Sequence, residues 1–125
     1  MTAAYVFRVR FRLDATDVRL DPREFDTVLR LPATDPSSED DPDGWLFFRD
    51  NLWHGEANDE RHLRETASDL LGVDVTSVIF SELEIDSESL DTLREAIAAD
   101  LEKFNADNVD EVLHKYLGSS IRVTD

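Results

Sequence analysis

Residues 5–13 read Tyr-Val-Phe-Arg-Val-Arg-Phe-Arg-Leu, and this stretch decides the fold of the 125-residue chain. Apolar side chains occupy the odd positions, and a valine and three arginines occupy the even ones. This alternation with a period of two predicts a β-strand with one buried face and one charged face. We therefore expect Arg8, Arg10 and Arg12 to project from the same side of the strand, at intervals of about 7 Å.

Working outward from this strand, alternating or continuous apolar runs predict four more strands, and apolar residues at spacings of three and four predict three helices. Each helix begins at a residue suited to capping: Asn58 or Asp59, Asp86 or Ser87, and Asn108. The predicted strands are residues 5–13, 24–31, 45–53, 73–85 and 121–123, and the predicted helices are residues 58–71, 86–105 and 108–117.

The order strand, strand, strand, helix, strand, helix, helix, strand predicts a two-layer α+β fold with a mixed five-stranded sheet and three helices packed on one face. Strands 45–53 and 73–85 enclose a helix of crossover length, so we expect them to be parallel. In the latter strand we expect Ile79 to share a face with Val75, opposite Val78 and Phe80.

The chain length predicts a single domain, residues 1–125. Residues 32–44 combine prolines, serines and acidic side chains, and this composition predicts a mobile acidic loop. The chain holds no cysteine, which excludes disulfides, a thiolate nucleophile and cysteine metal sites. No segment resembles a signal peptide or a membrane helix, so we expect a cytoplasmic protein.

Acidic residues dominate the charge, with 29 Asp and Glu against 13 Lys and Arg and a net charge of -16. Only Lys103 and Lys115 are lysines. Short carboxylates hold water and cations in concentrated salt, where repulsion between them is screened, and this composition is typical of a halophilic protein. We interpret the acidity as an adaptation to the solvent.

The charge is distributed unevenly: residues 1–30 carry six arginines and five acids, whereas residues 31–125 carry seven cations and 24 acids. Two interpretations of the arginine face stay open. Cross-strand carboxylates could pair with the arginines and leave a solvated face, or a partner could cover it. The candidate contact residues on this face are Arg8, Arg10, Arg12 and Arg30.

The partner that we expect is a protein, either a second copy that forms a homodimer or another chain. The alternative is RNA, a nucleotide or another small anionic ligand, bound by the same arginines with Trp45 and Trp53. We favour nucleic acid less, because residues 31–125 carry a net charge of -17. The polar residues within the strand 45–53 have two interpretations: Arg49 or Asp50 could anchor neighbouring loops, or the strand could line a ligand pocket with Trp45, Arg49, Asn51, Trp53 and His54.

No catalytic constellation, metal site or cofactor motif is recognised, and we predict a non-enzymatic binding module. His54 and His62 fit no standard metal spacing. Glu111 and His114 match a Glu-x-x-His pattern, but the further glutamates that a di-iron bundle needs are missing, so we assign Glu111 to helix capping.

Two stretches, residues 47–56 (Phe-Phe-Arg-Asp-Asn-Leu-Trp-His-Gly-Glu) and residues 115–121 (Lys-Tyr-Leu-Gly-Ser-Ser-Ile), together with the acidic composition, resemble the LWR-salt family of small haloarchaeal proteins. That family is named after a Leu-Trp-Arg motif. Leu52 and Trp53 match this motif, and His54 stands in place of its arginine. The resemblance implies a haloarchaeal cytoplasmic origin and no particular activity.

Overall fold

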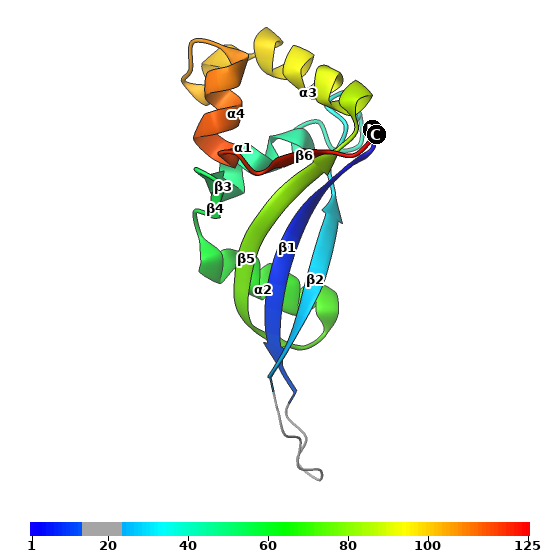
Figure 1. The fold of residues 1–125 in the computed structure, drawn as a ribbon, viewed down its shortest axis with the longest axis vertical. Coiled ribbons are helices and arrows are strands. Elements are labelled where there is room, and N and C mark those ends of the chain that lie inside the picture. The colour runs from blue at the N-terminus through cyan, green and yellow to red at the C-terminus, as the bar shows by residue number, and fades with distance from the viewer. Residues whose placement is uncertain (14–23) are drawn as a thin grey trace.

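The structure, a computed structural model that describes residues 1–13 and 24–125, contains a four-stranded sheet. Its strands are β1 (Ala3–Arg12), β2 (Glu24–Pro32), β5 (Asp74–Ile85) and β6 (Ile121–Val123). They lie in the order β2-β1-β5-β6, antiparallel except for the parallel pair β5 and β6 (Figure 1). The predicted α+β class with a mixed sheet is confirmed, with four strands in this sheet instead of five.

Residues 45–53, predicted as a strand, are mostly helical. A 3₁₀ turn (Gly44–Leu46) leads into the short helix α1 (Phe47–Asn51), and β3 (Leu52–Trp53) then pairs with β4 (Glu56–Ala57) in a separate two-stranded sheet. The segment buries Trp45, Leu46, Phe48 and Leu52. A short, largely apolar run fits a helix as well as a strand, so its pattern could not separate the two. The parallel pairing predicted for residues 45–53 and 73–85 is therefore wrong.

Three longer helices follow the predicted positions: α2 (Glu60–Leu71), α3 (Ser87–Ala99) and α4 (Val109–Leu117). Their caps are Asp59, Asp86 and Asn108, each of which accepts a hydrogen bond from the backbone N–H three residues later. The helix predicted to reach residue 105 ends earlier, and a separate 3₁₀ turn covers Leu101–Phe104. In Figure 1, α2 lies behind the long strands, while α1, α3 and α4 gather at one end of the sheet.

Strand β5 contains two irregularities that change which side chains are buried. Its register with β1 passes from Glu82 to Phe80 and from Ser77 to Val75, so Ser81 and Thr76 are extra residues on the β5 side. Each extra residue shifts the alternation by one position. As a result Val78 and Phe80 are buried with Val75, and Ile79 is 60% exposed, so the predicted grouping of Ile79 with Val75, opposite Val78 and Phe80, is wrong.

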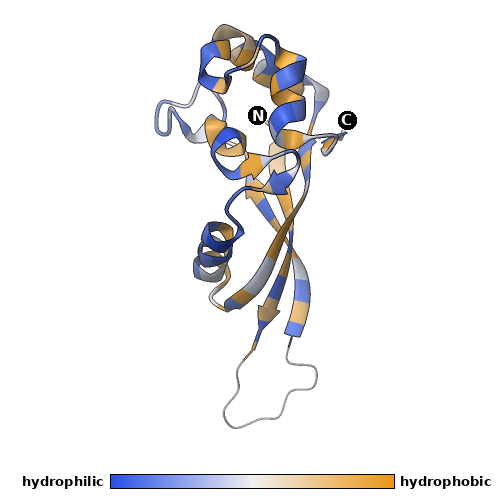
Figure 2. Ribbon diagram, turned by 90° about the vertical axis from the view of Figure 1, so that its left-hand side faces the viewer, coloured by the Kyte–Doolittle hydropathy of each residue, from blue (hydrophilic) through white to orange (hydrophobic). Residues whose placement is uncertain are grey.

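The core lies between the sheet and the helices, and its buried apolar residues form one cluster, apart from Val6. Phe7 and Val9 contribute from β1, where apolar and polar bands alternate along the strands (Figure 2). At the end where α1 and α4 meet, aromatic rings fill the interior: Phe48 stacks on Phe104 with 5.6 Å between the centroids, and Tyr116 packs edge-on against both. These contacts fix the position of α4 against α1.

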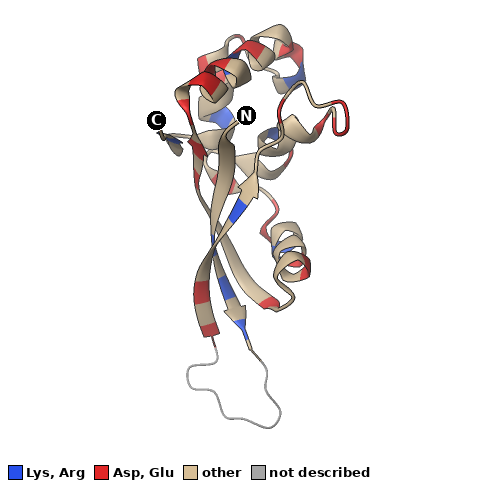
Figure 3. Cartoon of the chain, turned by 90° about the vertical axis from the view of Figure 1, so that its right-hand side faces the viewer, with Lys and Arg blue, Asp and Glu red and all other residues tan. Residues whose placement is uncertain are grey.

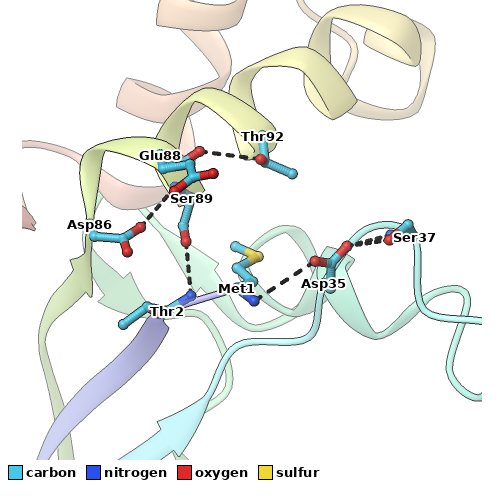
Figure 4. A network of polar contacts seen from close by, with 8 residues as sticks. All are labelled: Met1, Thr2, Asp35, Ser37, Asp86, Glu88, Ser89 and Thr92. Carbon is cyan, nitrogen blue, oxygen red and sulfur yellow. Dashed lines mark hydrogen bonds and ion pairs between the residues drawn. The ribbon is translucent and has the colours of Figure 1, made fainter.

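A polar network joins the first residues of the chain to the start of α3 (Figure 4). The backbone N–H of Thr2 donates to Ser89 Oγ at 2.8 Å, and the backbone N–H of Asp86 donates to the carbonyl of Thr2 at 3.1 Å. The side chain and the backbone N–H of Ser89 both hydrogen-bond to the Asp86 carboxylate and lower its pKa below the ordinary value. The network holds the start of β1 beside the end of β5.

Residues 33–43, between β2 and the 3₁₀ turn, contain local turns held by their own polar groups. The Asp35 carboxylate accepts from the backbone N–H and hydroxyl of Ser37 at 2.8 and 2.6 Å, and these bonds lower its pKa. The mobility of this stretch stays a prediction, as does the single-domain organisation. Among the described residues, no helix has the length and apolar character to cross a membrane.

Candidate functional site

One face of the sheet carries no helix, and the arginines of β1 lie on it. We call it the open face and define it by the side chains that the strand register places together. It includes Arg8, Arg10 and Arg12 from β1; Glu24, Asp26, Val28 and Arg30 from β2; Ser77, Ile79, Glu82 and Glu84 from β5; and Arg122 from β6.

Most arginines of the open face are paired with cross-strand carboxylates. Arg10 Nε donates to Asp26 at 3.1 Å, and Arg12 donates to Glu24 at 3.4 Å. Arg30 donates to Glu84 at 3.4 Å, and Arg122 contacts both Glu84 and Glu82, the latter at 3.0 Å. The sequence interpretation in which carboxylates pair with these arginines therefore describes most of the face, including the predicted contact residues Arg10, Arg12 and Arg30.

These pairs shift the pKa values of Glu84, Arg10 and Arg122. Hydrogen bonds from Arg122 and, second, from Arg30 lower the pKa of the Glu84 carboxyl. The hydrogen bond to Asp26 raises the pKa of Arg10. Figure 3 shows blue and red bands together on the strands, whereas the helices at the far end are banded mostly red. With Asp74, which the register places opposite Arg12, the open face has five arginines and five carboxylates, in a chain with a net charge of -16.

Arg8 differs from the other arginines of the open face. Within residues 1–13 and 24–125 it forms no ion pair, and its cross-strand neighbours are Val28 on one side and Ile79 on the other. These two apolar side chains are 49% and 60% exposed. They border a shallow hollow of 430 Å³, with Arg10, Asp26, Thr27 and Ser77 among its other lining residues. A guanidinium flanked by exposed aliphatic groups is thus the centre of the open face.

The residues proposed to line a pocket do not converge. Trp45 is 6% exposed and packs against Phe48 and Phe104 in the core. Arg49 pairs with the adjacent Asp50 at 2.9 Å, and the Asn51 side-chain amide donates to the carbonyl of Phe47 at 3.0 Å. Trp53 and His54 are exposed on the short hairpin of β3 and β4, away from the interior position of Trp45.

The family model described as LWR-salt protein matches this chain over residues 1–125. The chain belongs to the LWR-salt family. No curated protein and no solved structure matches it.

In this LWR-salt chain, the two stretches that carry the family resemblance pack directly against each other. The hairpin turn at His54 and Gly55 has positive φ at both positions, 51° and 79°. The backbone N–H of His54 donates to the carbonyl of Lys115 at 2.8 Å, and that of Gly55 donates to the carbonyl of Tyr116 at 2.9 Å. The hairpin thus satisfies carbonyls at the end of α4 that have no partner within the helix.

Glycine is required at this contact for steric reasons. A Cβ on Gly55 would lie 3.0 Å from the carbonyl oxygen of Leu117, and one on Gly118 would lie 3.3 Å from the carbonyl oxygen of His54. The sequence analysis did not predict this contact. Both glycines lie in the stretches that resemble the family, but a single sequence gives no signal that pairs two turns about sixty residues apart.

Trp53 is the most exposed aromatic residue of the hairpin, at 46%. Its ring packs edge-on against His54 and Tyr116, with centroids 4.7 and 5.8 Å away, and Lys115 Nζ lies 5.6 Å from its centroid. The lysine also donates to the carbonyls of Phe104 and Asn105. These backbone hydrogen bonds hold the Lys115 ammonium beside the Trp53 ring. The contacts of Trp53 therefore support a structural role for this residue of the LWR-salt motif.

The described residues contain no group of three or more His, Cys, Asp or Glu side chains that could hold a metal ion. His54 and His114 approach each other, with ring centroids 6.3 Å apart, whereas His62 lies on α2. The Glu111 carboxylate accepts from the backbone N–H of Asp107 at 3.1 Å, as expected for a capping residue.

Proposed function

We propose that this LWR-salt protein is a non-enzymatic binding module that docks a protein partner on the open face of its sheet. One observation carries the proposal: at the centre of the open face, Val28 and Ile79 expose aliphatic surface on both sides of Arg8, and Arg8 has no carboxylate partner among the described residues. An apolar patch that includes an arginine has the composition of an interface core.

The charge of the molecule supports the same location. Outside the open face the chain carries a large excess of carboxylates, so two acidic surfaces would repel each other on contact. The ion pairs of the open face neutralise each other, and a partner can approach it without that repulsion. A partner surface with aliphatic groups around one carboxylate would complement Arg8 and its two neighbours. Self-association through this face is one form of such docking.

The proposal is tested by comparing two variants that add the same charge at equally exposed apolar positions. Ile79 on the open face is 60% exposed, and Leu70 on α2 is 59% exposed. We expect Ile79→Lys to abolish the binding of proteins retained from a native high-salt extract, and Leu70→Lys to leave it unchanged. Light scattering of the purified protein identifies a partner that is a second copy. Equal retention by both variants would contradict the proposal.

A small anionic ligand at Arg8 is the second candidate, favoured by the hollow of 430 Å³ beside this arginine. An arginine without a carboxylate partner keeps its donors available for a phosphate group. We expect inorganic phosphate or a nucleoside monophosphate to raise the thermal unfolding midpoint of the wild type and of Arg12→Gln but not of Arg8→Gln. Equal shifts in all three proteins would exclude binding at this position. RNA is less favoured, because the other arginines of the open face are paired.

We also propose that the module works in the concentrated salt of a haloarchaeal cytoplasm. Its 29 acidic residues, its 13 cations and the use of lysine at only two positions support this proposal. Salt screens the repulsion between the carboxylates, so the free energy of unfolding should rise as KCl increases to about 3 M. Denaturant unfolding at several salt concentrations checks this expectation, and a decrease over that range would contradict it.

A further inference from the structure

Strand β2 forms an edge of the sheet, and no strand of the described residues pairs with its outer side. It is nine residues long and pairs with β1 without a register shift, whereas the pairing of β1 with β5 is interrupted twice. Its only proline is the last residue, Pro32. A long edge strand without a bulge or an internal proline is a template on which another strand can pair.

The direction of the backbone groups determines which pairings this edge allows. The backbone N–H of Ala33 donates to the carbonyl of Ala3 at 2.9 Å, so the odd-numbered residues of this segment direct their N–H and C=O groups toward β1. The even-numbered residues therefore direct theirs toward the free edge. In an antiparallel ladder with a second strand, even-numbered residues must face even-numbered residues. The outward set is Glu24, Asp26, Val28, Arg30 and Pro32.

We propose that two copies of this chain join through β2 in an antiparallel pair, with Val28 opposite the partner's Val28. This register meets the backbone requirement, and it pairs all nine residues of the strand because Val28 is its middle residue. It is also an isologous contact, in which each copy contributes the same surface. It adds about eight backbone hydrogen bonds, since the two prolines at the ends of the ladder each lack one donor.

The side chains of β2 on the open face have complementary charges in this register. Asp26 lies opposite the partner's Arg30, and Arg30 lies opposite the partner's Asp26. Within one chain Asp26 already accepts from Arg10 at 3.1 Å, and Arg30 already donates to Glu84 at 3.4 Å. The dimer therefore extends these pairs into an alternating row of charges across the junction. A shift by two residues, with Asp26 opposite the partner's Val28, pairs fewer residues and leaves that charge unmatched.

The side chains of β2 on the covered face of the sheet also fit the proposed register. Phe25, Leu29 and Leu31 are only half-buried, because α2 packs on β5 and leaves β2 at the margin of the core. In the proposed register Phe25 faces the partner's Leu31, and Leu29 faces the partner's Thr27. The second copy thus covers apolar surface that one chain leaves exposed.

The dimer would be a continuous eight-stranded sheet with the two open faces side by side. Its contact is the edge of β2, so Arg8 and Ile79 stay accessible. The inference therefore goes beyond the proposed function, and either can fail without the other. Docking on the open face requires a partner over the middle of the sheet, whereas the edge dimer requires a second copy beside β2.

Exchanging the charges at Asp26 and Arg30 tests the register. Sedimentation velocity measures dimerisation at about 0.5 M KCl, where salt screens charges that are more than about 4 Å apart. In Arg30→Asp each cross-strand pair joins two acids, and in Asp26→Arg each joins two arginines. We expect each variant to raise the dimer dissociation constant at least about tenfold. An equimolar mixture of the two variants restores opposite charges at both pairs, so it should form a heterodimer. Arg61→Asp, on α2 and away from both the edge and the open face, should dimerise like the wild type.

Hydrogen exchange of the wild type distinguishes the edge from the open face. The amides of Asp26, Val28 and Arg30 should exchange slowly at concentrations where the dimer forms and quickly when it is diluted. A wild type that stays monomeric, or a mixture of the charge variants that stays monomeric, would overturn the edge dimer. A dimer that exchanges quickly at these amides and is disrupted by Ile79→Lys would overturn it as well, while supporting docking on the open face.

Discussion

The two faces of the sheet differ in what holds their side chains in place. On the covered face Phe7 is 1% exposed and packs against rings from α1 and β5. On the open face Ile79 is 60% exposed, and most arginines of this face form ion pairs that remain in solvent. Buried apolar volume dominates folding free energy, whereas exposed ion pairs contribute little. Stability should therefore depend on the covered face, and recognition on the open one.

The largest effect is expected from Phe48→Ala on the covered side. Phe48 is fully buried and stacks on Phe104, so its truncation removes ring contacts and leaves a cavity. We expect a loss of about 3–5 kcal/mol in the free energy of unfolding, measured with denaturant. Val28→Ala on the open face is the control and should change the same quantity by less than about 0.5 kcal/mol. Equal losses would mean that the two faces do not divide these roles.

The next largest effect concerns the hairpin that docks on α4. Gly55→Ala places a Cβ in a left-handed backbone position and within 3.0 Å of the Leu117 carbonyl oxygen, so we expect a loss of about 3 kcal/mol. Gly72→Ala is the matched control, because Gly72 also has positive φ but has no atom within 4 Å of a new Cβ. Its loss should be about 1 kcal/mol. Chemical denaturation of both variants gives the two losses in the free energy of unfolding, and their difference measures the effect of the close approach of the Cβ to the Leu117 carbonyl oxygen. Identical losses would show that the backbone angle alone matters.

A smaller effect is expected from the capping carboxylate of α3 at low pH. The folded state lowers the pKa of Asp86, so its contribution to stability is complete above the unfolded pKa and declines as the pH falls below about 4. Asp86→Asn can still accept the bond from Ser89 but does not titrate. The variant should therefore lose less stability than the wild type between pH 5 and pH 2, read from thermal midpoints. Parallel profiles would show that other carboxyls carry this dependence.

The smallest effect is expected from the ion pairs of the open face. Arg10 and Asp26 are both solvent-exposed, so Asp26→Asn should leave the free energy of unfolding of the monomer unchanged within error, in both low and high salt. Unfolding of a dilute sample, below the concentration at which copies associate, gives this value. A loss comparable to that of Gly55→Ala would show that the charged face contributes to folding as much as the covered face does.

Periodicity predicted most of the fold, because β1, β2 and the three long helices each bury one face and expose the other. It failed at residues 45–53, where Trp45, Leu46, Phe48 and Leu52 are all buried and no polar face marks the period. It also failed at Ile79, since the extra residues in β5 appear only when β5 is aligned with β1. Both errors depend on tertiary contacts that local pattern does not contain.

The open face was predictable in part. The alternation in β1 placed three arginines on one side, and Asp26, Glu82 and Glu84 were available to pair with them across the strands. The sequence did not distinguish Arg8 from its neighbours, because the absence of an ion-pair partner for Arg8 among the described residues depends on Val28 and Ile79 lying opposite it. The pocket around Trp45 was not formed, because the predicted strand that would have aligned its residues is a helical turn.

The extra residues of β5 have a consequence for how the gene can change. Substituting Ser81 would alter one exposed side chain, and deleting its codon would leave Phe80 opposite Phe7 and Glu82 opposite Val6. Deleting the codon of a regularly paired residue such as Ile79 would instead turn Phe80 away from the core or make the strand slip along β1. Loss of a single codon should therefore be tolerated at Ser81 and selected against at the regularly paired positions of β5.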